Sequence, residues 1–306
     1  MKMVLPTDPA ALRACLEELH LIALEAARAA GRIIAEHTEG ERRSDITFKE
    51  GGGSLAASVL TEVDALAQRQ ITERLAPSRQ RWGLGLLAEE GVDDLSRLCT
   101  EAFWCVDPLD GTLPFVEGNA GYAVAIALVR RDGVPLLGVV FDPVEQHLYH
   151  AVQGGGAYRD GKRWQASQVP DKGRPLSFFT DRSFTEHPSF AEITTALKQL
   201  GRQQGHEGVE INATAGAVMN ACWTLERQPA CYFKLPKAAP GGGNIWDYGA
   251  TACIAQEFGA SVSDCRGKPL DLNNPKTVMM NDGGICFASD SELAELLLTK
   301  LIPRFL

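Results

Sequence analysis

Asp107-Pro108-Leu109-Asp110-Gly111-Thr112 is the stretch of this sequence that decides its fold, because a buried strand there gives way to a turn and a helix. The apolar run Phe103 to Val106 before it has the composition of a strand. Pro108 cannot continue a central strand, Gly111 permits a tight turn, and Thr112 belongs to the residue types that cap helices. We predict that both aspartates leave one strand on a fixed turn. The amides of Gly111 and Thr112 then lie at a helix start, where a phosphate oxygen can be bound.

The two aspartates of this turn need partners of opposite charge. Two carboxylates about 5 Å apart repel by roughly 3 kcal/mol at an effective dielectric of 20, and each further carboxylate adds to this. Protons or cations relieve the repulsion, and a set of oxygen ligands selects hard cations, of which magnesium is usual in phosphate chemistry. Taken alone, however, the turn also fits an ordinary Asp-Gly turn with two solvated acids.

Three further acidic segments change this interpretation. Glu89-Glu90 follows the apolar run Leu84 to Ala88, Asp64 lies in the first turn of a predicted helix, and Trp246-Asp247 opens another helix. Each alone fits a surface pair or an acid that satisfies a helix N-terminus. Four such elements in this order indicate one acidic site built from distant parts of the chain.

Helical and strand-like segments alternate along the rest of the sequence. We predict a helix over 8–40 with Asp8 as its N-cap, a loop over 41–58, and a second helix that Thr61 caps and that ends before Pro77. Short apolar runs predict strands at 102–106, 122–129, 136–141, 146–152 and 176–180, and a hairpin turn at Asp160-Gly161. Further helices are predicted at 189–200, 213–225 and 247–258.

This order of elements predicts a layered α/β (α+β) protein with two subdomains. The polar segment 165–175 is the predicted boundary. Residues 1–172 then form an N-terminal α+β metal-binding subdomain. Residues 173–306 form a C-terminal α/β subdomain that contributes Asp247 and substrate contacts.

In these motifs the sequence resembles the inositol monophosphatase superfamily of magnesium-dependent, lithium-sensitive phosphatases, which includes bisphosphate nucleotidases. The resemblance rests on Thr61-Glu62-Val63-Asp64, Glu89-Glu90, the turn at 107–112, and Trp246-Asp247 through Glu257-Phe258-Gly259, and it covers nearly the whole chain. It implies a fructose bisphosphatase-like fold, an alternating αβαβα sandwich. It also implies a hydrolase that cleaves phosphoric monoesters.

The resemblance further implies roles for individual residues. Glu89, Asp107 and the Leu109 carbonyl would hold one magnesium ion, and Asp107, Asp110 and Asp247 a second. Glu89 would also contact a third, weaker ion, so the site takes two or three ions and Glu89 counts among the catalytic residues.

The resemblance also implies which residues act on the water and the phosphate. Asp64 and Thr112 would orient and deprotonate the attacking water. Gly111 and Thr112 would bind the phosphate. Glu90 would contact the metal-binding residues without binding the metal itself.

The substrate is harder to predict than the reaction. Lys234 and Lys237 precede the glycine run Gly241 to Gly243 and could receive a second phosphate, or form a solvated basic loop. The candidates are therefore a small sugar or inositol phosphate, and a 3'(2'),5'-bisphosphate nucleotide. Lys49 lies where relatives often carry a phosphate-side lysine. Leu113-Pro114-Phe115 and Gly259-Ala260 depart from the family pattern without touching the metal ligands.

Two readings outside this family are weaker. A haloacid dehalogenase-like phosphatase also has an Asp-Gly-Thr turn, but it needs another aspartate two residues before that turn's aspartate. Here the turn's aspartate is Asp110, and position 108 is proline. A catalytically silent binding protein that kept the fold would not need all of the expected acidic positions, yet every one of them is filled.

Composition sets further limits. A net charge of −9, from 30 Lys and Arg against 39 Asp and Glu, disfavours nucleic acid polymers and anionic membranes as partners, which leaves a small phosphorylated metabolite. The eight cysteines lack the spacing of a zinc site and read as reduced thiols. With neither an N-terminal leader nor a membrane span expected, we predict a cytoplasmic location. Dimers are common in the family, so the resemblance allows a homodimer.

Overall fold

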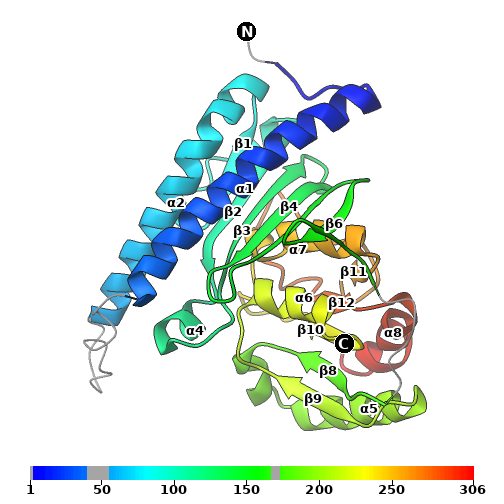
Figure 1. The fold of residues 1–306 in the computed structure, drawn as a ribbon. Helices are drawn as coiled ribbons and strands as arrows, with labels where there is room; N and C mark the ends of the chain where they lie inside the picture. The colour runs from blue at the N-terminus through cyan, green and yellow to red at the C-terminus, as the bar shows by residue number, and fades with distance from the viewer. Residues whose placement is uncertain (1–2, 40–54, 167–172) are drawn as a thin grey trace.

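A computed structural model of the chain describes residues 3–39, 55–166 and 173–306, arranged as five layers in the order helix, sheet, helix, sheet, helix (Figure 1). This arrangement confirms the predicted αβαβα sandwich. Lys49 lies outside the described residues, as does most of the predicted 41–58 loop.

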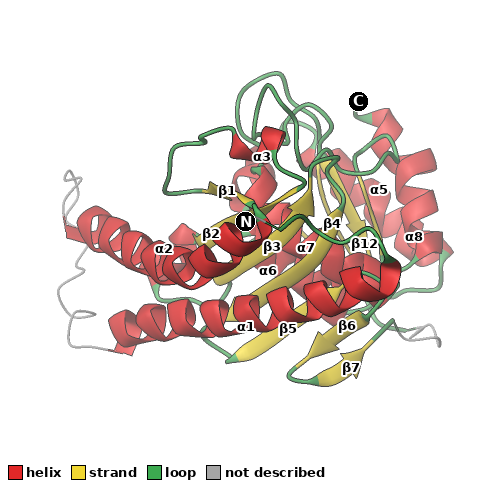
Figure 2. Ribbon diagram, turned by 90° about the horizontal axis from the view of Figure 1, so that it is seen from above, coloured by secondary structure: helices red, strands yellow, loops and turns green. Residues whose placement is uncertain are grey.

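The first layer consists of α1 (Pro9–Glu39) and α2 (Leu55–Trp82), which lie side by side on one face of the larger sheet (Figure 2). In α1 the buried side chains recur at helical spacing, as in Leu16, Leu19, Ala23 and Ile34. Asp8 is the N-cap as predicted, since its Oδ2 accepts the Ala11 amide at 2.9 Å.

The second helix differs from its prediction at both ends. It begins at Leu55 instead of near Thr61, so Asp64 lies in its third turn and not in its first. It also continues through Pro77 to Trp82. The buried side chains of Leu75 and Trp82 carry the helix past the proline, because packing of an apolar face outweighs one lost backbone hydrogen bond.

The larger sheet, sheet A, has seven strands in the order β1-β2-β3-β4-β5-β6-β7, and only β1 and β2 run parallel. Its strands and the two short helices within its connections are β1 (Gly85–Ala88), α3 (Ser96–Cys99), β2 (Ala102–Asp110), α4 (Thr112–Glu117), β3 (Ala123–Arg130), β4 (Pro135–Asp142), β5 (His147–Val152), β6 (Gly156–Arg159) and β7 (Lys162–Trp164). The predicted hairpin turn is confirmed, with positive φ angles at Asp160 and Gly161.

The remaining layers come from the second half of the chain. Sheet B has five strands in the order β11-β12-β10-β8-β9. Helices α6 and α7 lie between the two sheets, and α5 and α8 cover the outer face of sheet B (Figure 1). The bounds of these elements are β8 (Leu176–Phe179), a 3-10 turn (Arg182–Glu186), α5 (Phe190–Gln203), β9 (Val209–Asn212), α6 (Ala217–Glu226), β10 (Ala230–Lys234), α7 (Ile245–Phe258), β11 (Ser261–Ser263), β12 (Ile285–Ala288) and α8 (Ser291–Leu296), followed by irregular helical turns to Arg304.

Helix α7 is apolar all round because both of its sides are covered. Tyr248, Ala252 and Ile254 are each no more than 1 % exposed and belong to the core between the sheets. One end of this buried helix therefore lies deep in the molecule, where it can place a polar side chain beside sheet A.

The predicted boundary at 172/173 stays a prediction. It falls between β7, the last strand of sheet A, and β8, the first strand of sheet B, next to residues 167–172 that the structure does not describe. Within the described ranges, no helix has the length and apolar character that a bilayer span requires.

Candidate metal centre

Asp107, Asp110 and Asp247 meet at one point, with one oxygen of each carboxylate within 4.8 Å of the others. The first two come from the end of β2 and the third from the start of α7. The carboxylates are largely or fully withdrawn from water, and Asp107 is 1 % exposed. Three of the predicted ligands are thus brought together from positions 140 residues apart.

The turn that carries the aspartates is built differently from its prediction. Strand β2 does not stop at Pro108 but continues to Asp110, with a register shift between Asp107 and Asp110 against β3. Pro108 is tolerated because a bulged position needs no ladder hydrogen bond. The Leu109 amide donates to Asp107 Oδ1 at 3.0 Å, which fixes that carboxylate.

The helix start after the turn is also different. Gly111, at φ 85°, is the N-cap of α4, and Thr112 is its first helical residue, so Thr112 is not the cap that we predicted. A left-handed conformation at this position suits glycine and disfavours other residues. Thr112 is exposed and faces the cavity described below.

Asp110 has a second structural role that the sequence did not predict. Its two carboxylate oxygens accept the amides of Ala217 at 3.1 Å and Val218 at 2.8 Å, at the N-terminus of α6. Gly216 makes this approach possible, because a Cβ there would collide with Asp110 Oδ2 and the Gly111 backbone. The helix N-terminus therefore stabilises the carboxylate while leaving oxygen lone pairs for another partner.

Asp247 is the third residue of α7 and not its cap. Asn244 caps the helix, and the Asn244 amide donates back to Asp247 Oδ2 at 3.1 Å in a capping box. This reciprocal pair fixes where the Asp247 carboxylate points. The predicted helix start at 247 is displaced by two residues.

Glu89, Glu90 and Asp64 form the other side of the centre. Glu89 follows β1, and its carboxylate lies within hydrogen-bonding reach of Asp107. Burial raises the pKa of Asp64 to about 7, and the negative charges of Glu90 and Glu89 add to the effect. Glu90 is exposed, and its amide donates to Gln68 of α2.

The centre holds more negative charge than the protein neutralises. Burial, followed by the neighbouring carboxylates, raises the pKa of Asp107 and Asp110 well above their usual range. Partial burial of its carboxylate also raises the pKa of Glu89, although the residue as a whole is exposed. Asp107 and Glu89 place two negative charges side by side, and a proton or a cation between them would relieve the repulsion. Burial raises the pKa of Asp247 to about 7, even though Lys234 opposes the shift.

These properties fit divalent magnesium. The donors are all oxygens, they are clustered, and the raised pKa values mean that a cation would replace protons that the carboxylates otherwise retain. Asp107, Asp110 and Asp247 are the residues that could hold it, with Glu89 adjacent.

A cavity of about 330 Å³ opens beside the carboxylates. Its lining includes Asp110, Thr112 and Asp247. It also includes Asp181, Arg182 and Lys234 from the second half of the chain. Lys237, the other predicted substrate contact, is exposed and is not among the lining residues.

Lys234 is buried, at 8 % exposure, and its Nζ lies 2.5 Å from Asp181 Oδ2. Burial opposes the charge of the ammonium, but Tyr248, Asp181 and Asp247 outweigh it and raise the pKa of Lys234. Lys234 therefore stays charged inside the cavity wall.

Sequence reasoning missed Asp181 and Arg182. Asp181 pairs with Lys234, and Arg182 forms a two-pronged ion pair with Glu117 of α4, with distances of 2.6 and 2.8 Å. Both residues lie just after strand β8, separated from it by Thr180, so a search for charged residues near the ends of apolar runs would have found them.

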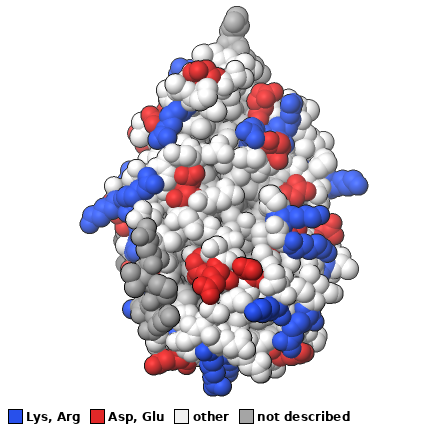
Figure 3. Space-filling model, turned by 90° about the vertical axis from the view of Figure 1, so that its right-hand side faces the viewer, with Lys and Arg blue, Asp and Glu red and all other residues white. Residues whose placement is uncertain are grey.

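The surface charge agrees with the acidic composition. On the face drawn in Figure 3, acidic and basic side chains of the described residues are interspersed.

The chain is similar to known proteins in sequence and in fold. The sequence model of the inositol monophosphatase family matches residues 15–302. The 3'(2'),5'-bisphosphate nucleotidase CysQ of Escherichia coli (strain K12) is 32% identical over 258 residues, which are 84% of this chain and 94% of CysQ. Inositol monophosphatase 1 of Sus scrofa is 27% identical over 258 residues, 84% of this chain and 87% of that protein.

Solved structures of similar fold include inositol monophosphatase-II of Staphylococcus aureus, with a TM-score of 0.71 at 20% identity, covering 94% of this chain and 96% of that one. A structure of SaIMPase-II with bound 2'AMP has a TM-score of 0.69 at 20% identity, covering 94% of this chain and 95% of that one.

Proposed function

Because this chain belongs to the inositol monophosphatase family of phosphoric monoester hydrolases, we propose that it cleaves a small phosphate monoester with magnesium held by Asp107, Asp110 and Asp247. The observation that carries the proposal is the convergence of three buried carboxylates beside a cavity that is large enough for a small metabolite. Bound magnesium supplies positive charge that stabilises the entering and leaving oxygens of an in-line displacement.

The other predicted residues have roles that suit their positions. Asp64, with a pKa of about 7 and Glu89 beside it, would accept the proton of the attacking water near neutral pH. The amides of Gly111 and Thr112, at the start of α4, would orient the phosphate, and the Thr112 side chain faces the cavity. The Leu109 carbonyl lies on the same bulge, between the two aspartates.

The metal requirement gives the first test. Purified protein stripped with EDTA should hydrolyse p-nitrophenyl phosphate at a background rate, and added Mg²⁺ should restore activity by more than about 100-fold. The measurement is release of nitrophenolate against Mg²⁺ concentration. Equal rates with and without Mg²⁺, or no hydrolysis on a broad panel of phosphate esters, would contradict the proposal.

Two substrate classes stay open within this reaction. An inositol or sugar phosphate would use the cavity wall through its hydroxyl groups, with the Asp181 carboxylate as acceptor. A 3'(2'),5'-bisphosphate nucleotide would place its second phosphate near Lys234 and Arg182. The buried ammonium of Lys234 and the likeness to CysQ support the second class.

Lys234→Met separates these classes, since the change keeps the length of the side chain and removes its charge. If the substrate carries two phosphates, kcat/KM for 3'-phosphoadenosine 5'-phosphate should fall about 10 to 100-fold, whereas that for inositol 1-phosphate should change less than about threefold. Lys237→Met is the matched control and should leave both unchanged, because Lys237 lies outside the cavity lining. An equal loss on both substrates would assign Lys234 to the fold or to general catalysis.

The remaining predictions concern the setting of the enzyme. Lithium sensitivity, two or three ions, a homodimer and a cytoplasmic location stay predictions. Seven of the eight free cysteines are buried and Cys99 is exposed, which supports a reducing compartment.

A further inference from the structure

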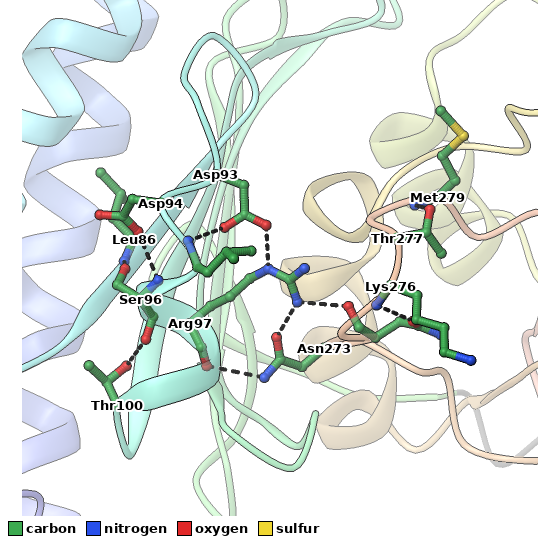
Figure 4. A network of polar contacts seen from close by, with 12 residues as sticks. Leu86, Asp93, Asp94, Ser96, Arg97, Thr100, Asn273, Lys276, Thr277 and Met279 are labelled. Carbon is green, nitrogen blue, oxygen red and sulfur yellow. Dashed lines mark hydrogen bonds and ion pairs between the residues drawn. The ribbon is translucent and has the colours of Figure 1, made fainter.

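Arg97 is a fully charged side chain in the interior, at 2 % exposure, and it joins two segments that are far apart in sequence (Figure 4). It lies in α3, within the connection from β1 to β2. Two of its partners, Asn273 and Asn274, lie about 176 residues later, in the loop between β11 and β12. An arginine buried this completely needs all of its donors near acceptors.

The planar guanidinium of Arg97 contacts both segments at once. Its Nε donates to Asp93 Oδ2 at 2.8 Å, and its Nη1 donates to Asn273 Oδ1 at 2.7 Å and to the Asn274 carbonyl at 2.8 Å. Asn273 in turn donates to the carbonyls of Arg97 and Arg131. The amide oxygen and the amide nitrogen of the Asn273 side chain are therefore both used.

On one side, this network leads to Glu89. Asp93 belongs to the short segment that follows Glu89 and Glu90, and α3 is attached to β1 because Ser96 Oγ accepts the Leu86 amide. Glu90 is held at the other end of this segment by Gln68. The segment between Glu89 and Arg97 is therefore short, and hydrogen bonds fix it at both ends.

On the other side, the network leads to Asp247. The segment after Asn274 reaches Val278, whose carbonyl accepts the Ile245 amide at 2.8 Å, and Met280, whose amide donates to the Gly243 carbonyl at 2.9 Å. These bonds flank Asn244, the residue that forms the capping box with Asp247. Arg97 therefore hydrogen-bonds to the same loop that supports the start of α7.

We propose that Arg97 is a positioning residue that holds Glu89 and Asp247 at the spacing required for magnesium, an inference that rests on the proposed function. The carboxylates of the centre repel one another before a cation binds, and repulsion tends to separate the two segments that carry them. A rigid connection resists that separation, so less of the binding free energy of magnesium is spent on bringing the ligands together.

Calorimetric titration of EDTA-stripped protein with Mg²⁺ alone tests this proposal. Arg97→Lys keeps a positive charge within reach of Asp93 but lacks the planar fork that reaches Asn273 and Asn274 together. We expect the Mg²⁺ dissociation constant to rise about 10-fold, while KM for the phosphate ester at saturating Mg²⁺ and kcat change less than about twofold. Asn273→Ala removes the link from the opposite side and should produce the same rise, also in case Arg97→Lys does not fold.

The double variant provides a sharper criterion. If both residues act through one connection, combining the two changes should raise the dissociation constant little beyond either single change. Ser78→Ala is the control, because it removes another buried hydrogen bond, from Trp104 Nε1, far along α2 from Asp64. It should lower Tm without changing Mg²⁺ affinity.

Two results would overturn the inference while leaving the proposed function intact. One is that Arg97→Lys and Asn273→Ala lower Tm yet bind Mg²⁺ as the parent protein does. The other is that kcat and KM change while Mg²⁺ affinity does not. Absence of saturable Mg²⁺ binding by the parent protein would instead contradict the proposed function itself.

Discussion

Asp107→Asn is expected to lower kcat by on the order of 1,000-fold or more, while the protein remains folded. Asp107 is the residue that the centre can least replace, because it neighbours Asp110 and Asp247 on one side and lies within hydrogen-bonding reach of Glu89 on the other. An amide has the shape of the carboxylate and can still accept the Leu109 amide through its oxygen. It cannot supply the negative charge that a divalent cation requires.

Steady-state hydrolysis and Mg²⁺ titration of the same preparation measure this effect. Asp132→Asn serves as the matched control: Asp132 is also an aspartate near a turn, but it is exposed and pairs with Arg130. The control should retain activity within about twofold. Retention of more than about a tenth of the parent rate in Asp107→Asn would show that Asp107 does not contribute to a metal centre.

The layered fold could be predicted because its signals are local. The apolar stripe of α1, the Asp8 cap and the turn at Asp160-Gly161 each depend on a few neighbouring residues, and the structure contains all three. Four acids of the centre could be named for a related reason, since Glu89, Asp107, Asp110 and Asp247 lie at or near the end of a strand or the start of a helix. Asp64 does not follow this rule, because it lies in the third turn of α2.

The details that failed depend on contacts between distant segments. Nothing in the neighbourhood of Pro77 shows that α2 passes through it, because the packing of α2 on α1 and sheet A decides this. Asp107 to Asp110 was predicted to leave the strand, whereas pairing with β3 keeps these residues in the strand around a bulge.

Partners of the site residues were even less predictable than secondary structure. The amides that bind Asp110 come from α6, about 107 residues later in the chain. Asp181 meets Lys234 only because β8 and β10 are neighbours in sheet B. Such pairs follow from strand order, which one sequence does not reveal.

The free energy of unfolding should depend on pH in a way that reports the repulsion among the carboxylates of the centre. Burial raises the pKa of Asp64 and of Asp247 to about 7, from 3.8 in each case. Between about pH 4 and 7 the folded protein without cations thus binds more protons than the unfolded chain, so these groups reduce the free energy of unfolding as pH rises. A single group shifted this far contributes up to about 4 kcal/mol.

Another pair of residues acts in the opposite direction and must be separated from this effect. Burial lowers the pKa of His20 and of His150 to about 4 from 6.5, so the folded chain binds fewer protons there and the pair increases stability as pH rises from 4 to 6.5. The net pH profile of the parent protein alone therefore does not isolate the carboxylates. A comparison of two variants with the same histidines does.

In EDTA, the free energy of unfolding of Asp107→Asn should exceed that of the parent protein, and the difference should grow from pH 5 to pH 8. The substitution removes one member of a repelling cluster whose protons are lost over this range, and the histidine contribution cancels in the difference. Mg²⁺ should stabilise the parent protein more at pH 8 than at pH 5, because protons compete with the cation, and should stabilise the variant little at either pH. Urea unfolding at both pH values measures each quantity. A parent protein that is more stable than Asp107→Asn in EDTA at pH 8 would mean that the carboxylates are satisfied within the protein and require no cation.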